Sequence, residues 1–132
     1  MTEQRVAISR EADIVAARQA GRQLAAQIGF SSTDQTLIAT AISEVARNIV
    51  VYAQEGEILL SRTDDDGRVG IQVVAVDRGP GIDNKDLAMR DGYSTKNSLG
   101  LGLPGARRLM DDFALDSEVG KGTTVTMKKW RR

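Results

Sequence analysis

The segment TAISEVARNIVVYA, residues 40–53, combines the apolar spacing of a helix with two polar residues one turn apart. The stripe consists of Leu37, Ile38, Ala41, Ile42, Val45, Ile49 and Tyr52. It predicts a helix that begins after Ser31 or Ser32 and runs to about Ala53. Glu44 and Asn48 share one face at the edge of this stripe. They are equally well explained as a partly solvated boundary pair or as oxygen groups that hold Mg²⁺ and activate a hydroxyl.

A second motif, DRGPG at residues 77–81, follows a predicted strand over Val69–Val76. An acidic residue after an apolar run is expected to be partly buried, so Asp77 needs donors, and an adenine amino group can supply one. Gly79 and Gly81 allow a sharp bend and a close approach to a flat ligand. An ordinary turn at the end of a strand explains the same residues.

The third motif is GLGLPG, residues 100–105, directly before a helix predicted over Pro104–Met110. Backbone N–H groups at a helix start attract phosphate. The motif lacks the Lys-Ser/Thr of a Walker A loop, and it follows no strand, which excludes a dinucleotide fingerprint. Residues 91–98 before it are polar and suit either a lid over a ligand, with Lys96 near a terminal phosphate, or a solvated loop.

A fourth motif, GKGT at residues 120–123, opens the last predicted strand, Thr123–Lys129. The Thr123 hydroxyl could reach a base or an ordered water. Taken alone, the motif is better explained as a hairpin turn after the strand Phe113–Ser117.

The remaining elements complete a β-α-α-β-β-loop-α-β-β order. A strand over Arg5–Ser9 precedes a helix that Gly29 ends, and the strand Glu57–Thr63 leads into a hairpin turn at residues 64–67. Strands that arrive in adjacent pairs favour an α+β fold. We expect a two-layer sandwich, with a mixed, mostly antiparallel sheet and about three helices on one face.

Composition limits the chemistry. The chain has 132 residues, 18 basic and 18 acidic side chains, no histidine and no cysteine. The length predicts a single domain over residues 1–132. Histidine-based triads, thiolate sites and imidazole ligands are excluded, so a metal would be held by oxygen, as Mg²⁺ is. Zero net charge offers no argument for a nucleic-acid or membrane partner, and without an apolar leader we expect a cytoplasmic protein.

The order of the four motifs and the lid resembles the GHKL (Bergerat-fold) ATPase and kinase superfamily. The resemblance extends from about Val6 to Trp130. The stretches at residues 13–25, 40–53 and 99–113 are similar to the small serine-protein kinases of the bacterial stressosome and their anti-sigma-factor kinase relatives.

The resemblance implies roles for individual residues. Asn48 would ligate Mg²⁺ at the ATP phosphates, and Glu44 would orient or deprotonate the attacking hydroxyl. Asp77 and Thr123 would bind the adenine edge. The other members of the expected nucleotide site are Gly79, Gly81, Lys96, Gly100, Leu101, Gly102 and Gly105. Some relatives carry an arginine where this chain has Lys96 and Asn97, and whether Lys96, Arg107 or Arg108 replaces it stays open.

The resemblance also implies partners. The first hypothesis is an ATP-dependent serine/threonine kinase for STAS-domain antagonist and scaffold proteins. When released, it would activate a PP2C-type phosphatase through its regulatory domain. The second is an anti-sigma factor that has kinase activity and inhibits a sigma subunit. The third is a nucleotide-gated binding module with negligible turnover, against which Glu44 weighs because a pure binder needs no base.

Overall fold

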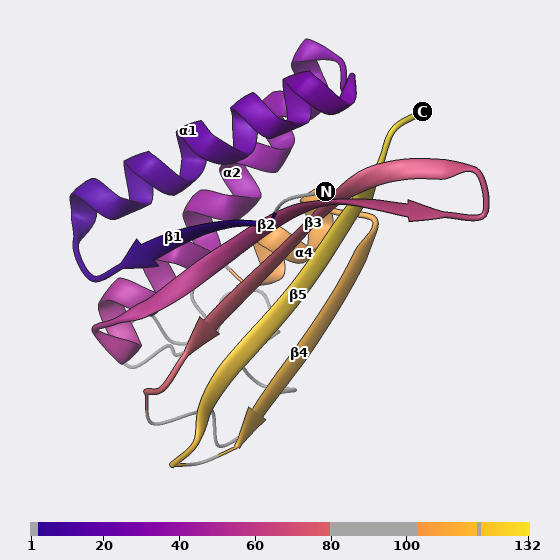
Figure 1. Cartoon of the computed structure of the whole chain (residues 1–132). Coiled ribbons are helices and arrows are strands. Elements are labelled where there is room, and N and C mark those ends of the chain that lie inside the picture. The colour runs from indigo at the N-terminus through magenta and orange to yellow at the C-terminus, as the bar shows by residue number, and fades with distance from the viewer. Residues whose placement is uncertain (1–2, 80–102, 119) are drawn as a thin grey trace.

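Five strands form one antiparallel sheet in the order β1-β2-β3-β5-β4 (Figure 1). The computed structural model describes residues 3–79, 103–118 and 120–132. In chain order the elements are β1 Gln4–Ile8, α1 Glu11–Ile28, α2 Ser32–Asn48, η1 Ile49–Ala53, β2 Gly56–Asp65, β3 Arg68–Asp77, α4 Leu103–Leu109, β4 Asp112–Glu118 and β5 Gly122–Trp130. The expected α+β sandwich is confirmed, and every pairing among these strands is antiparallel.

The three helices of the described chain, α1, α2 and α4, lie on one face of the sheet. Along β3 and β5, buried residues alternate with half-exposed ones, because successive side chains point to opposite faces. The core between the layers is aliphatic, and its largest fully buried members include Ile38, Ile42, Ile58, Ile71 and Met127. The helices therefore bury one face of the sheet.

The predicted helix boundaries at residues 28–34 are confirmed. Gly29 takes a left-handed backbone with φ 107°, and its N–H donates to the carbonyls of Ala25 and Ala26. Ser31 starts α2, where its hydroxyl accepts from the Asp34 N–H at 3.1 Å. The second helix therefore begins where a capping serine satisfies its first N–H groups.

The end of the second helix differs from the expectation. The α-helix stops at Asn48, and the next five residues form a π-helical turn in which the Gln54 N–H donates to the Ile49 carbonyl at 2.8 Å. Gln54 then leaves the turn with φ 71°. Apolar spacing does not distinguish a π turn from an α turn over five residues, and such turns are frequent at functional sites.

The hairpin between β2 and β3 is tighter than predicted. Its loop is Asp66-Gly67, with φ of 50° and 84°, so the strands continue to Asp65 and from Arg68. Two left-handed residues match the twist of the flanking strands.

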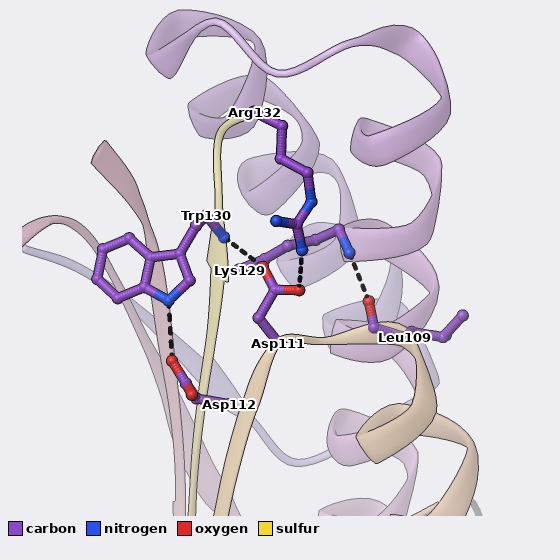
Figure 2. Close-up of polar contacts among 6 residues, drawn as sticks. All are labelled: Leu109, Asp111, Asp112, Lys129, Trp130 and Arg132. Atoms are coloured by element: carbon purple, nitrogen blue, oxygen red, sulfur yellow. Dashed lines mark hydrogen bonds and ion pairs between the residues drawn. The ribbon is translucent and has the colours of Figure 1, made fainter. Parts of the chain in front are cut away.

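Polar contacts fasten the C-terminal strand to the segment after α4 (Figure 2). The buried Lys129 ammonium donates to the Leu109 carbonyl at 2.9 Å and satisfies the end of α4. Asp111 accepts from the Trp130 N–H at 2.7 Å, and Asp112 accepts from the Trp130 indole at 2.9 Å. The C-terminal end of α4 is thereby fixed against β5.

The helical stretch Ser32–Ala53 is long and apolar enough to span a membrane by composition alone. Half of its apolar window is buried inside the fold, where α2 packs on α1 and α4. This composition is the one expected of a core helix.

Candidate active site

Asp77, the last residue of β3, is a buried carboxylate that backbone donors hold in place. Its Oδ1 accepts from the Gly79 N–H at 2.9 Å and from the Thr123 N–H at 3.2 Å. Burial raises the pKa of Asp77 above its ordinary value, and the two hydrogen bonds partly oppose that rise. Its Oδ2 receives no hydrogen bond from residues 3–79, 103–118 or 120–132. Within the described chain, one carboxylate oxygen is therefore held by two N–H groups while the other has no donor and suits a ligand.

Two hydroxyl groups continue from Asp77 across the sheet. Asp77 pairs with Thr123 on β5, and Thr123 pairs with Ser117 on β4. The Ser117 and Thr123 hydroxyls are 2.8 Å apart, and Ser117 Oγ also donates to the Gly122 carbonyl at 3.1 Å. Both side chains are buried. We call Asp77, Thr123 and Ser117 the polar row.

Glycines surround the polar row because neighbouring atoms leave no space for a side chain. Gly122 has φ 98°, and a Cβ there would collide with the backbone carbonyl of Asp77. A Cβ at Gly79 would lie 2.6 Å from the Cβ of Ala53. The glycine at 79 therefore lets the end of β3 pack against the π turn η1.

Asn48 ends α2 and is 7% exposed, and its Oδ1 has no hydrogen-bond partner among the described residues. A buried oxygen without a donor is costly, so it fits a cation or a ligand that completes it. Glu44, one turn earlier, is half-buried, and its carboxylate makes no hydrogen bond or ion pair within the described chain. Within the described chain, both side chains are therefore available for a ligand.

The end of α2 and the polar row lie at the same end of the molecule (Figure 1). Ile49 follows Asn48, and its Cγ2 would be 3.0 Å from a Cβ at Gly56. Gly56 is in turn the β2 partner of Asp77. A cavity of about 400 Å³ borders Asp77 along β1 and β2, and another of about 320 Å³ borders Asp77, Ser117 and Thr123. The whole polar row lines the second cavity, and Glu44 and Asn48 line neither of these two cavities.

The structure brings together Asp77, Gly79 and Thr123, with Asn48 at the same end of the fold. Gly105 lies half-buried in α4 with open space where a Cβ would stand. No packing demand from the described residues therefore explains the glycine at 105. Five other expected site residues lie outside the described residues, as does the proposed lid at residues 91–98: Gly81, Lys96, Gly100, Leu101 and Gly102.

Ser117 is the site residue that the sequence reasoning missed. It ends the strand predicted over Phe113–Ser117, and Thr123 begins the next one. In an antiparallel hairpin the residues that flank the loop face each other, so a Ser–Thr pair across the strands could have been predicted.

Comparisons with known proteins agree with this geometry. Residues 8–129 match the histidine kinase-like ATPase domain family. The chain is 50% identical over 127 residues to the serine/threonine-protein kinase RsbT of Bacillus subtilis, covering 96% of each chain. It is 34% identical over 111 residues to the anti-sigma F factor of Geobacillus thermodenitrificans, covering 79% of this chain and 75% of that one.

A solved structure shows the same fold. The RsbU and RsbW domains of a Mycobacterium tuberculosis protein superpose with a TM-score of 0.68 at 21% identity. The match covers all of this chain and 33% of that one. Together, the full-length match to RsbT and the ATPase family model show that the chain belongs to the histidine kinase-like ATPase family, among its RsbT serine/threonine-protein kinases.

Proposed function

We propose that the chain transfers the terminal phosphate of ATP to a serine or threonine of a STAS-domain protein. The observation that carries the proposal is the buried Oδ1 of Asn48, which has no partner among the described residues. Asn48 ends α2 and Asp77 ends β3, and these two elements end on the same side of the molecule (Figure 1). The end of the site at Asp77 suits the adenine base of a nucleotide, and the end at Asn48 suits a cation bound to its phosphates.

At the adenine end, Asp77 is the group that would distinguish adenine from other bases. Its Oδ1 is occupied by two backbone N–H groups, so Oδ2 is the atom that would accept from the adenine amino group. Thr123 stands beside it through a backbone hydrogen bond to the same carboxylate. Because these side chains are held before a ligand arrives, little ordering is needed on binding.

At the phosphate end, Asn48 fits the oxygen chemistry that Mg²⁺ requires, since its amide oxygen is buried and lacks a donor. When bound, Mg²⁺ supplies charge neutralisation for the phosphate groups. Gly105 leaves open space at its Cα, which suits close backbone approach to a phosphate. In our proposal Lys96, Gly81, Gly100, Leu101 and Gly102 complete the nucleotide site.

Glu44 is the proposed catalytic residue. It is one helical turn from Asn48, half-buried, and without an ion-pair partner in the described chain, so its carboxylate is free to receive a proton. It would orient the hydroxyl of the protein substrate and accept its proton as oxygen attacks phosphorus. The terminal phosphate then leaves ADP and becomes a phosphoester on the substrate.

The relatives support a partner-switching role. The Bacillus subtilis relative, at 50% identity, is named a serine/threonine-protein kinase, which supports phosphate transfer to a protein hydroxyl. In our proposal the substrates are STAS-domain antagonist and stressosome scaffold proteins. We infer that the released kinase activates a PP2C-type phosphatase through its regulatory domain. We also infer a cytoplasmic location, a single domain over residues 1–132, and neither nucleic acid nor membrane as a partner.

A second candidate function is an anti-sigma factor with kinase activity. The 34% identity to an anti-sigma F factor favours it, although the identity to RsbT is higher over more of the chain. The same nucleotide site serves both functions. Co-purification with a sigma subunit, or with a phosphatase regulatory domain, separates them.

The experiment for the proposal is incubation with labelled ATP, Mg²⁺ and a purified STAS-domain protein. We expect acid-stable label on a serine or threonine of that protein. Hydrolysis of ATP without label on the protein would contradict the proposed transfer, and tight ATP binding without turnover would leave only a nucleotide-gated binding module.

A further inference from the structure

The hydroxyl protons of the polar row have fixed directions. Ser117 Oγ donates to the carbonyl oxygen of Gly122 at 3.1 Å, and a carbonyl oxygen can only accept. The 2.8 Å contact between Ser117 Oγ and Thr123 Oγ1 must then use the Thr123 proton. Thr123 Oγ1 is therefore left with lone pairs alone for any further partner.

The neighbouring Asp77 has the same character. When ionised, a carboxylate only accepts, and Oδ2 receives no hydrogen bond from the described chain. Asp77 and Thr123 pair across β3 and β5, so two acceptors stand side by side at the end of the sheet. The group of the ligand that faces both acceptors has to supply hydrogen-bond donors, as a 6-amino group does with its two N–H bonds and a 6-oxo group does not.

We propose that Ser117 is a positioning residue that holds the Thr123 hydroxyl as an acceptor and so makes the site prefer 6-amino over 6-oxo purines. The inference rests on the proposed function, which places the base of ATP against Asp77. Without Ser117, the Thr123 hydroxyl can turn and donate to a 6-oxo group. Asp77 alone would then oppose binding of an oxo purine.

Burial strengthens the hydrogen bonds that orient the Ser117 and Thr123 hydroxyls. Ser117 and Thr123 are each 7% exposed, so bulk water does not compete for their protons. Hydrogen bonds in such surroundings are stronger than in water, and an unmade one costs more. Gly122 contributes as well, because its left-handed backbone with φ 98° presents the carbonyl that receives the Ser117 proton.

The test compares the dissociation constants of ATP and inosine triphosphate, measured by calorimetry with Mg²⁺. In Ser117→Ala we expect the preference for ATP to fall about 3- to 10-fold, the size of one redirected hydrogen bond, mainly through tighter inosine triphosphate binding. Adding Thr123→Val to Ser117→Ala removes the hydroxyl that turns, so the gain for inosine triphosphate should disappear. Thr126→Ala, on the same strand but on the face away from the helices, is the matched control and should keep the wild-type ratio.

An unchanged ratio in Ser117→Ala, or equal weakening of both nucleotides, would overturn the proposal, because a merely structural serine predicts that result. If Ser117→Ala does not fold, Ser117→Cys keeps the volume with a weaker donor. It should lower the ratio in the same direction, and an unchanged ratio there is equally contrary. Wild-type protein that binds neither nucleotide would overturn the proposed function itself, which distinguishes the two failures.

Discussion

Asp77 and Thr123 face each other across β3 and β5, and the Thr123 N–H donates to Asp77 Oδ1 at 3.2 Å. The two residues are 46 positions apart in the chain, so sheet pairing alone unites them. The Gly79 N–H donates to the same carboxylate oxygen at 2.9 Å. This arrangement orients a buried carboxylate before any ligand binds.

Replacing Asp77 by asparagine should put a hydrogen-bond donor where the site now has an acceptor for the adenine amino group. The amide oxygen can still accept from Gly79 and Thr123, but the amide nitrogen would present donors where Oδ2 presents an acceptor. We expect ATP affinity to fall about 5- to 150-fold, because a donor would then face the adenine amino group. Calorimetric titration measures the affinity, with Asp66→Asn in the exposed turn between β2 and β3 as control.

The same substitution should change the pH dependence of stability. Burial raises the pKa of Asp77 above its ordinary 3.8, so the native state favours the protonated carboxyl. Preferential protonation of Asp77 in the folded protein stabilises it fully below the pKa that Asp77 has in the unfolded chain. This stabilisation is lost as the pH rises through the pKa that Asp77 has in the folded protein. The free energy of unfolding of Asp77→Asn, relative to wild type, should therefore increase from about pH 4 towards neutrality. Urea unfolding at several pH values tests this. The unfolding free energy of Asp77→Asn minus that of wild type should increase with pH, and a decrease would be the contrary result.

Asn48→Ala should separate nucleotide binding from folding. The buried Oδ1 makes no hydrogen bond within the described chain, so its removal costs only the lost packing, about 1 kcal/mol. Mg²⁺-dependent ATP affinity should fall by more than about tenfold. Thermal unfolding and nucleotide titration are compared with Thr40→Ala, an exposed site on the same helix. Retained Mg²⁺-ATP affinity would remove Asn48 from the metal site.

Alanine substitutions at Gly105 and Gly122 should change stability in opposite directions. The new methyl group in Gly105→Ala meets no atom of the described residues within 4 Å and lies inside α4, so the substitution should raise stability by about 0.5–1 kcal/mol while weakening ATP binding. Gly122→Ala should lower stability by more than about 1 kcal/mol, since φ is 98° and the Cβ would meet the Asp77 carbonyl. Chemical denaturation and ATP titration distinguish them. Unchanged ATP affinity in Gly105→Ala would mean that no phosphate approaches there.

Much of the fold follows from local patterns. Apolar spacing, the Ser31 cap and the left-handed Gly29 are short-range features, and each predicted element is present within a few residues of its expected bounds. The π turn after Asn48 was not predictable. Ala53 lies close to Gly79 and Ile49 lies close to Gly56, and apolar spacing within the helix does not reveal such contacts between separate segments.

The sequence predicted several residues of the site, but not the contacts that join them. Motif order identified Asn48, Asp77 and Thr123, but the role of Ser117 appears only when β4 and β5 are in register. The steric need for glycine at 79 also comes from outside its motif, from Ala53. The roles proposed for Gly81, Lys96, Gly100, Leu101 and Gly102 stay predictions.

Glu44 gives the most direct test of the proposed phosphotransfer. In Glu44→Gln the shape is kept and the proton acceptor is lost, so ATP affinity should stay within about twofold while transfer falls at least about 100-fold. The measurement is single-turnover transfer of labelled phosphate from Mg²⁺-ATP to a STAS-domain protein, with ATP affinity determined on the same samples. Transfer at the wild-type rate by Glu44→Gln would contradict the account, as would wild-type protein that binds ATP but labels no serine or threonine.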